Sequence, residues 1–399
     1  MTFPSFRLEN KDVVCLSHLR WDSVFQRPHH LMSRFARTGR VLFVEEPVLE
    51  PGTAYMQVSR RDGGITVVTP HVPPDLTDSD RDDLQRQLLD TVLDDYRMGN
   101  FVLWYYTPMA IEFTRHLEPL AVVYDCMDEL SAFSGAPLPL RERESELFGR
   151  ADLVFTGGQS LYEAKRDRHD RVYAFPSSVE AAHFARAREL QGDPPDQVRI
   201  PHPRLGFFGV IDERMDLELV RGIAEAHPDW HQVFVGPVIK IDPAWLPRRP
   251  NIHYLGPKAY TLLPEYLAGW DVALLPFARN DATRFISPTK TPEYLAGGRR
   301  VVSTAIHDVV HPYGDAGLVR IADGVSSFIA AIEAALANEE SDREFAERVD
   351  AFLARTSWDQ TWEQMNDLIQ SLILDRRVSA AQLGGRAAPA RATVASAAE

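Results

Sequence analysis

Short segments that are apolar at consecutive positions alternate with amphipathic segments along most of this chain, and this alternation limits its fold more than any other feature. Strands that are apolar throughout are buried on both faces, which is typical of a parallel sheet covered by helices on both sides. Helices are predicted between these strands, for example over 27–39 and from near Asp78. The apolar segments of the first half are VVCLSHL (13–19), VLFVEE (41–46), GITVVTP (64–70), FVLWYY (101–106), AVVYD (121–125), LVFTGG (153–158) and VYAFPSS (172–178).

The pattern stops between residues 186 and 203 and then starts again. The intervening RARELQGDPPDQVRIPHP has four prolines, a glycine and mixed charge, which predicts a linker. We therefore expect two doubly wound α/β domains, 1–190 and 200–355, with ligands bound at the carboxyl ends of their strands in the cleft between them. The second set of predicted strands is RLGFFG (204–209), QVFVG (232–236), IHYLG (252–256), DVALLPF (271–277), RVVST (300–304) and GLVRI (317–321).

The end of the chain is predicted to be helical and then disordered. Apolar residues recur at every third or fourth position from Ser357 to Asp375, which gives one apolar helix face and predicts a separate helix over 356–376. Residues 378–399 are rich in Ala and Gly and have no aromatic residue, so we expect disorder there.

Charge and composition exclude several classes of protein. The 43 Lys and Arg residues against 57 Asp and Glu give a formal net charge of −14, which disfavours general binding to nucleic acid or to an anionic membrane. Cys15 and Cys126 lie in apolar segments and are expected to be buried, reduced thiols. No apolar segment approaches the roughly 20 residues that span a bilayer, and the N-terminus lacks the apolar core of a signal peptide. We expect a cytoplasmic protein with no nucleic-acid partner and at most peripheral membrane contact.

Two patterns have the spacing of metal ligands without the rest of a metal site. His307 and His311 are four residues apart, but the glutamate of the zinc-protease motif is missing and Pro312 follows directly. The aspartates at 78, 80 and 82 begin a predicted helix, where acidic residues favour the helix dipole without any ligand. No G-x-G-x-x-G and no phosphate-loop motif is present, which disfavours dinucleotide oxidoreductases and kinases. We expect no metal and no cofactor.

Segment 287–298 (SPTKTPEYLAGG) has the pattern of a phosphate site. Thr291 fits a helix N-cap and Pro292 the first helical position, and Gly297 or Gly298 fits the end of that helix. The helix N-terminus would then offer backbone N–H groups to a phosphate, next to the side chains of Ser287, Thr289 and Lys290.

Glu293 lies in the first turn of the same predicted helix. A carboxylate at this place can accept hydrogen bonds from both hydroxyls of a ribose. The alternative is a well-capped helix with an acidic first turn and no ligand.

These segments together resemble a known family. Leu205–Ile321 is similar to the donor half of GT-B glycosyltransferases of the family-4-like group (glycosyl transferases group 1), through FFGVIDERMD, QVFVGP, NIHYLG, YLAGWDVALLPF, SPTKTPEYLAGGRRVVST and GDAGLVRI. WDSVFQRPHHLMSRFA, VVYDCMDELSAF and FPSSVEAAHF resemble a subgroup from bacterial surface-polysaccharide clusters. The resemblance covers about residues 12–370. It implies two Rossmann-like domains facing a cleft, and a C-terminal helix that crosses back to the N-terminal domain.

The resemblance also implies a nucleoside diphosphate sugar as donor and assigns residues to it. Glu293 matches the second glutamate of the family's paired-glutamate motif, which holds the ribose, whereas Phe285 stands where the first glutamate is expected. Arg214 and Lys240 are the nearest equivalents of the Arg/Lys pair that neutralises the diphosphate, and a solvated surface pair is the alternative for both. Gly209, in the loop that leads to Arg214, is assigned to the donor site as well. The base is expected to meet backbone groups near 256–258.

In the N-terminal half, Asp125 closes a predicted strand at the position where family members have a histidine or carboxylate that faces the sugar, and Asp128 follows one turn on. Two neighbouring carboxylates raise the pKa of one of them, which suits a proton acceptor; capping of the following turn is the alternative. Arg27 precedes Pro28 at the start of a predicted helix, so we expect it at the cleft edge, where it suits a phosphate.

The sequence thus predicts a glycosyltransferase that moves a sugar from a nucleoside diphosphate sugar to a saccharide or lipid-linked acceptor in the synthesis of cell-envelope polysaccharide or glycolipid. The resemblance favours retention of anomeric configuration without a metal. The alternatives are a sugar-nucleotide epimerase or a phosphorylase of the same fold, and a catalytically silent sugar-nucleotide-binding partner protein, which Phe285 motivates.

Overall fold

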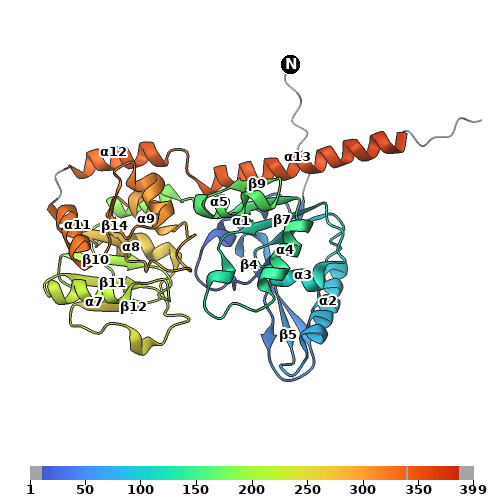
Figure 1. Cartoon of the computed structure of the whole chain (residues 1–399), viewed down its shortest axis with the longest axis horizontal. Coiled ribbons are helices and arrows are strands. Elements are labelled where there is room, and N and C mark those ends of the chain that lie inside the picture. Colours follow the sequence, from blue (N-terminus) through green and yellow to red (C-terminus); the bar gives the residue numbers. More distant parts are fainter. Residues whose placement is uncertain (1–10, 338–339, 386–399) are drawn as a thin grey trace, which may run out of the picture.

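The computed structural model describes residues 11–337 and 340–385. Two α/β lobes lie side by side, and a long C-terminal helix runs along the N-terminal lobe (Figure 1). Each lobe contains its own sheet, so the two doubly wound domains expected from the sequence are present.

The N-terminal sheet has the order β3-β5-β2-β1-β6-β7-β8-β9, with β4 paired to β5. Every pairing in it is parallel except the one between β4 and β5. Its strands are β1 Asp12–Ser17, β2 Val41–Glu45, β3 Val48–Leu49, β4 Tyr55–Arg61, β5 Ile65–Val72, β6 Phe101–Tyr105, β7 Ala121–Cys126, β8 Leu153–Thr156 and β9 Val172–Ala174.

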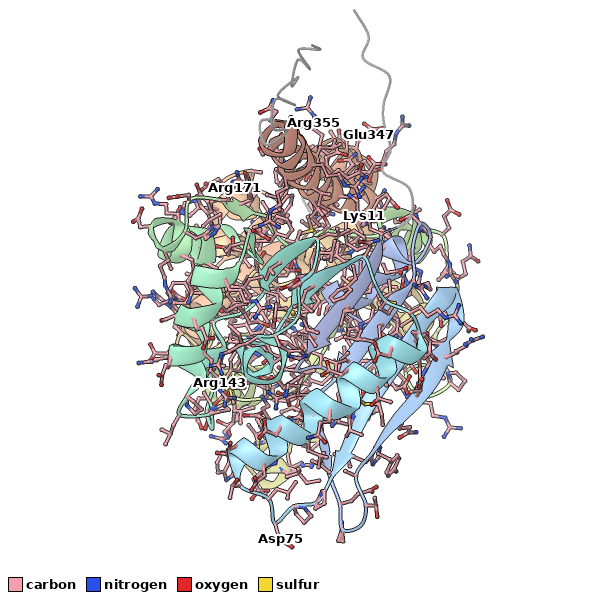
Figure 2. The ribbon with its side chains drawn as sticks, turned by 90° about the vertical axis from the view of Figure 1, so that its right-hand side faces the viewer. Lys11, Asp75, Arg143, Arg171, Glu347 and Arg355 are labelled. Atoms are coloured by element: carbon pink, nitrogen blue, oxygen red, sulfur yellow. The ribbon has the colours of Figure 1, made fainter. Side chains whose placement is uncertain are left out.

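Consecutive strand residues of this sheet feed two separate cores, which is why the strands are apolar throughout. Val14 and Leu16 pack with helices on one face, while Val13 and Cys15 pack with helices on the other. The first face carries α2 Asp78–Asp95, α3 Ile111–Thr114, α4 Leu140–Arg150 and α5 Gln159–Lys165, and the second carries α1 Arg27–Phe35 and α13 Trp358–Gly385. Figure 2 shows α2 lying across the strands of the first face.

The C-terminal sheet is parallel throughout and has the order β12-β11-β10-β13-β14-β15. This is the strand order of a doubly wound nucleotide-binding fold. Its strands are β10 Arg204–Phe208, β11 His231–Val235, β12 Ile252–Gly256, β13 Val272–Leu275, β14 Arg300–Ser303 and β15 Val319–Ile321. Its helices are α6 Ala181–Ala185, α7 Leu217–Ala226, α8 Leu263–Ala268, α9 Lys290–Ala296, α10 His307–Val309, α11 Val325–Ala337 and α12 Asp342–Leu353.

The structure adds an antiparallel hairpin that the apolar pattern does not predict. β4 is mostly exposed and polar, and it pairs with β5 through a turn in which Gly63 and Gly64 have positive φ. Because the prediction relied on continuously apolar runs, this edge strand escaped it.

The predicted linker is irregular in structure but is held against the C-terminal domain. The Gln197 side chain is buried, accepts a hydrogen bond from the indole N–H of Trp270 at 3.0 Å and donates to the carbonyl of Tyr266 at 3.1 Å. Asp193 forms an ion pair with Arg204 at 2.7 Å. The segment therefore behaves as part of the second domain.

Helix α13 crosses back to the N-terminal domain, as the resemblance implied. Trp358, Met365 and Ile369 are buried in the core that includes Phe35 and Trp104. The helix does not end near 376, however, but continues to Gly385, so the prediction of disorder from 378 is wrong for 378–385; Ala, Gln and Leu in this stretch are good helix formers. The rest of the predicted tail, 386–399, lies outside the described residues.

Two other expectations concern burial and membranes. Cys15 and Cys126 are buried free thiols. Within 11–337 and 340–385, no helix is long and apolar enough to cross a membrane.

Candidate functional site

Two adjoining cavities lie where the carboxyl-terminal edges of the sheets face each other. The larger, of ≈ 590 Å³, is lined by 22–25 from the loop after β1 and by C-terminal residues that include 257–260 and 289–290. The smaller, of ≈ 110 Å³, lies between Arg27 and Asp128 on one side and the loop 286–290 on the other. Both cavities lie at the positions where the strand order reverses, beside β1 and β10, and such positions bind ligands in open α/β sheets.

Gly209 and Lys290 form the common wall of both cavities. Gly209 follows β10 with a φ of +133°, and a Cβ on it would lie 2.1 Å from Cε of Lys290. The Tyr294 hydroxyl accepts a hydrogen bond from the backbone N–H of Phe208 at 2.9 Å, which fixes α9 against the end of β10. A side chain at 209 would therefore displace the end of Lys290 from its present position in the cavity wall.

Helix α9 starts earlier than predicted. It begins at Lys290 with Thr289 at the cap position, so the expected N-cap at Thr291 is wrong. The Thr291 N–H already donates to the Pro288 carbonyl at 3.2 Å, which places this residue inside the first turn. Gly298 ends the segment with a φ of +76°, as expected.

Half-buried Lys290 and buried Glu293 carry opposite charges one helix turn apart. Burial lowers the pKa of Lys290, and the nearby Arg214 guanidinium lowers it further. Burial raises the pKa of Glu293, against the pull of the Lys290 charge. Neither side chain makes a hydrogen bond to another described residue, and both face the larger cavity. The two charged groups are therefore placed to meet a ligand.

Of the two cations assigned to the diphosphate, Arg214 lines a cavity and Lys240 does not. Arg214 lines the small cavity beside Lys290, and Asp212 holds it through Nε at 2.9 Å and Nη2 at 2.6 Å. Lys240 is exposed and lines neither cavity. Phe133 of the N-terminal domain lies near both, with its ring centre 5.6 Å from Cζ of Arg214 and 5.5 Å from Nζ of Lys240. Lys290 is thus the lysine that lines the small cavity together with Arg214.

Arg27 lines the small cavity at the cleft edge, as expected, but its guanidinium is bound to Asp125. Both are buried, and Arg27 donates to the Asp125 carboxylate from Nε at 3.0 Å and from Nη2 at 2.8 Å. Arg27 also donates to the Phe175 carbonyl at 2.7 Å. Burial makes this pairing necessary, because an unpaired charge in the interior is costly.

Asp128, one turn beyond Asp125, is the carboxylate that lines the small cavity. Burial raises its pKa, while the Arg214 and Arg27 charges lower it. The raised pKa was expected from a second carboxylate, but its main cause is burial. Of the two aspartates, Asp128 has the geometry of a group that can touch a ligand.

The loop before α9 contacts the N-terminal domain directly. The Ser177 hydroxyl donates to the Ser287 carbonyl at 2.6 Å, and Thr289 lines both cavities. Phe285, at the position where the family has a glutamate, packs against the core of the N-terminal domain and lines neither cavity. This position therefore serves the contact between domains.

The sequence did not point to the aromatic wall of the large cavity. Phe25 and Tyr260, from different domains, stack with ring centres 4.4 Å apart. The Tyr260 hydroxyl donates to Glu180 at 3.1 Å, and Glu180 lies 3.7 Å from the buried His30. In the sequence, Phe25 lies two residues before Arg27, and Tyr260 lies two residues after the segment 256–258. This closeness to predicted site residues could have indicated that both aromatic residues belong to the site.

Among the described residues, no group of three or more His, Cys, Asp or Glu side chains could hold a metal ion. His307 and His311 bond to Asp308 and Asp315 instead, at 2.9 Å and 2.6 Å. Asp308 also accepts hydrogen bonds from the backbone of Gln159 at 2.8 Å and so joins the two domains.

Sequence comparison finds one related protein over part of the chain. No family model matches. A stretch of 202 residues is 27% identical to a Bacillus subtilis (strain 168) protein named "Putative teichuronic acid biosynthesis glycosyltransferase TuaH", and it covers 46% of this chain and 50% of that protein. The match thus spans about half the length of this relative.

Solved structures match nearly the whole chain at low identity. Sucrose-phosphate synthase from Thermosynechococcus elongatus has a TM-score of 0.70 at 13% identity and covers 92% of this chain and 100% of that one. An α,α-trehalose-phosphate synthase (UDP-forming) from Burkholderia xenovorans in complex with glucose-6-phosphate has 0.65 at 13%, with 91% and 100% covered. The catalytic domain of starch synthase IV from Arabidopsis thaliana bound to ADP and acarbose has 0.62 at 9%, with 92% and 99% covered. At these identities the likeness establishes a common fold.

Proposed function

The chain has the GT-B fold expected from its sequence, and we propose that it is a glycosyltransferase that moves a sugar from a nucleoside diphosphate sugar to an acceptor in the synthesis of cell-envelope polysaccharide or glycolipid. The name of the Bacillus subtilis relative supports the acceptor class. Retention of anomeric configuration, independence of a metal and a cytoplasmic location are parts of the same proposal.

The observation that carries the proposal is the pair of cations that line the small cavity between the domains, Lys290 and Arg214. A departing nucleoside diphosphate gains negative charge as the glycosidic bond breaks, and fixed cations in a site shielded from water stabilise that charge strongly. Asp212 holds the Arg214 guanidinium in place before the donor arrives. The ion pair therefore reduces the reorganisation that binding requires.

The residues around these cations are assigned to the ribose, the nucleoside and the sugar of the donor. Glu293 faces the larger cavity with its carboxylate and is assigned to the ribose hydroxyls. Phe25 and Tyr260 border the same cavity and are assigned to the nucleoside. The sugar then extends into the smaller cavity, where Asp128 is the carboxylate within reach.

Asp128 is assigned to the reacting sugar or the acceptor hydroxyl, because it is the carboxylate that lines the small cavity and burial raises its pKa, which favours proton transfer. Asp125 is assigned a supporting role, since its bonds to Arg27 fix the helix start beside the cavity.

Binding of nucleotide sugars tests the donor assignment. In a thermal-shift panel of UDP-, GDP- and ADP-sugars, the matching donor at 100 times its Kd should stabilise the protein by about 2.7 kcal/mol. Lys290→Met should abolish the shift. Lys258→Met is the matched control, because Lys258 lines the large cavity but is paired with Asp196 at 2.7 Å. No shift with any donor would refute the proposal.

Turnover tests the chemistry. Slow hydrolysis of the bound donor by the purified protein is expected, and NMR of a transfer product should show the donor's anomeric configuration. Tight binding with no turnover under any acceptor would favour the alternative of a silent sugar-nucleotide-binding partner, for which the position of Phe285 in the domain contact is the motivating observation.

A further inference from the structure

Lys240 lines neither interdomain cavity, yet its backbone conformation is costly. Its φ is +62°, and in the described part of the chain Arg97 is the other residue besides glycine with a positive φ. A residue with a Cβ keeps such a conformation where surrounding contacts hold it, often at functional sites. Lys240 is exposed and makes no hydrogen bond or ion pair with another described residue. The contact that holds its side chain lies in the opposite domain.

The ammonium of Lys240 lies against an aromatic ring of the N-terminal domain. Nζ is 5.5 Å from the ring centre of Phe133, and Cζ of Arg214 is 5.6 Å from the same centre. An aromatic ring attracts cations that lie over its face within about 6 Å of its centre. The C-terminal domain thus holds this ring with two charged side chains.

The titratable groups of the N-terminal domain near Lys240 agree with this position. Glu46 follows β2; burial raises the pKa of its carboxyl group, while the charges of Arg20 and Lys240 lower it. His18 follows β1, and burial lowers its pKa to about 4, so the neutral imidazole does not repel the ammonium at pH 7. Lys240 is therefore within electrostatic reach of the carboxyl ends of β1 and β2.

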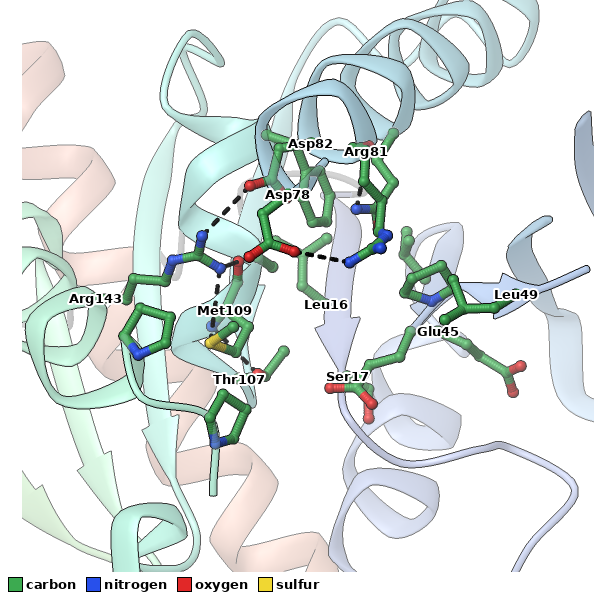
Figure 3. A pocket seen from close by; sticks show the side chains of 18 of the residues that line it. Leu16, Ser17, Glu45, Leu49, Asp78, Arg81, Asp82, Thr107, Met109 and Arg143 are labelled. Atoms are coloured by element: carbon green, nitrogen blue, oxygen red, sulfur yellow. Dashed lines mark hydrogen bonds and ion pairs between the residues drawn. The ribbon is translucent and has the colours of Figure 1, made fainter. Parts of the chain in front are cut away.

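Phe133 belongs to the loop 127–139 between β7 and α4, which also contains Asp128. The start of this loop borders the small interdomain cavity, and its end borders a separate cavity of ≈ 540 Å³ within the N-terminal domain (Figure 3). In its middle, the Ser134 N–H donates to the carboxylate of Glu213 from the C-terminal domain at 3.0 Å. The C-terminal domain therefore holds this loop at two consecutive residues, between the two cavities.

The position of Asp128 at the donor site depends on closure of the cleft. Asp128 lines the small cavity together with Lys290 and Arg214, which belong to the other domain. Separation of the domains would remove the carboxylate from these cations. A contact that holds the loop against the C-terminal domain therefore also holds Asp128 in the site.

Resting on the function proposed above, we infer that Lys240 is a positioning residue: it binds Phe133 across the cleft and holds the loop of Asp128 against the donor site, without contacting the diphosphate. The resemblance to the family implied a lysine bound to the diphosphate. The two roles predict different effects of the same variants.

Lys240→Met removes the charge and keeps most of the length of the side chain. A cation–π contact at an exposed site contributes about two- to fivefold to an equilibrium, so the ratio of closed to open molecules should fall by this factor. The affinity for a nucleoside diphosphate should fall by no more than the same factor. Lys240→Arg should restore the ratio, because a guanidinium also binds an aromatic face. A loss of affinity of tenfold or more in Lys240→Met would place Lys240 on the diphosphate and overturn the inference.

Single-molecule energy transfer between two dyes measures the ratio of closed to open molecules without any donor. The dyes are attached at Asp75→Cys and Asp229→Cys, two exposed positions in different domains, because the native Cys15 and Cys126 are buried. An unchanged ratio in Lys240→Met would overturn the inference. With a donor and an acceptor present, kcat should fall with the ratio, while the KM for the donor stays within the same factor.

Two further comparisons separate this contact from a general loss of stability. Lys240→Gly should raise the urea midpoint, because glycine adopts a positive φ without strain, and yet lower the closed ratio as Lys240→Met does. Arg97→Gly, at a φ of +50°, is the matched control, which should raise the midpoint and leave the ratio unchanged. In a Phe133→Leu background, Lys240→Met should have no further effect on the ratio. A full additional effect there, or an unchanged ratio in Lys240→Gly, would contradict the contact.

Nucleotide binding by the wild type separates this inference from the proposed function. If the wild type binds no nucleotide sugar while Lys240→Met still opens the cleft, the proposed function fails and the contact between Lys240 and Phe133 stands. If the wild type turns over its donor and Lys240→Met keeps the closed ratio, the inference alone fails.

Discussion

Replacing Gly209 by alanine should weaken diphosphate binding without touching the diphosphate itself. The new Cβ would lie 2.1 Å from Cε and 2.7 Å from Nζ of Lys290. Carbon atoms pack at about 3.5–4.0 Å, so the end of the lysine side chain must move by about 1.4 Å or more. The ammonium then loses its position beside Arg214.

The magnitude follows from the bond that is lost. A hydrogen bond to a charged group is worth about 1.5–3 kcal/mol, which corresponds to a loss of about 10- to 150-fold in affinity for the nucleoside diphosphate. The backbone at a φ of +133° disfavours alanine as well, at about 1–3 kcal/mol of stability. Isothermal titration with the nucleoside diphosphate and with the bare nucleoside separates the two effects, because only the diphosphate affinity depends on Lys290.

Gly192→Ala is the matched control, since Gly192 also has a positive φ, +92°, but has no atom within 4 Å of an added Cβ. It should lose stability and keep its diphosphate affinity. A double-mutant cycle with Lys290→Met should show that the two losses do not add. A folded Gly209→Ala variant that binds the diphosphate within about twofold of the wild type would refute the reasoning.

Four further outcomes are expected. Glu293→Gln should weaken donor binding about 10-fold while leaving the urea midpoint nearly unchanged, as titration and unfolding would show. Asp128→Asn should lower kcat by about 10²–10⁴-fold. Asp125→Asn should instead cost about 3–5 kcal/mol of stability, because it leaves the buried Arg27 without its charged partner. The reverse pattern would return the catalytic role to Asp125. Burial lowers the pKa of His30 to about 4, so the folded state binds fewer protons than the unfolded state as the pH falls. The free energy of unfolding should therefore decrease by about 2 kcal/mol between pH 7 and pH 5. The urea midpoints of His30→Gln should lack this part of the decrease. Truncation after Ala354 should melt the N-terminal domain, because it removes the buried face of α13, and separate melting of the other domain alone would contradict the packing.

The division into helices and strands could be predicted because it depends on local patterns. β12 begins and ends at the predicted residues 252 and 256. Lys290 and Glu293 could be found together because three residues in a helix bring side chains to one face. β4 could not be found in this way, since an edge strand has no continuous apolar run.

The partners of the charged residues could not be predicted. Arg27 and Asp125 are 98 residues apart, and each was assigned separately to a ligand until the fold showed them bound to each other. Phe285 packs against the core of the N-terminal domain, and Lys240 lies near the ring of Phe133 from that domain. Both contacts join residues of different domains, which local sequence patterns do not predict.

The apolar pattern by itself determined two α/β domains and a helix with one buried face, because the burial of a side chain repeats with the period of its own secondary structure. The tertiary structure alone decided which charges are free to meet a ligand. A buried charge needs a partner, and whether that partner is a neighbouring side chain or a bound substrate depends on which distant residues the closed domains bring within about 3 Å.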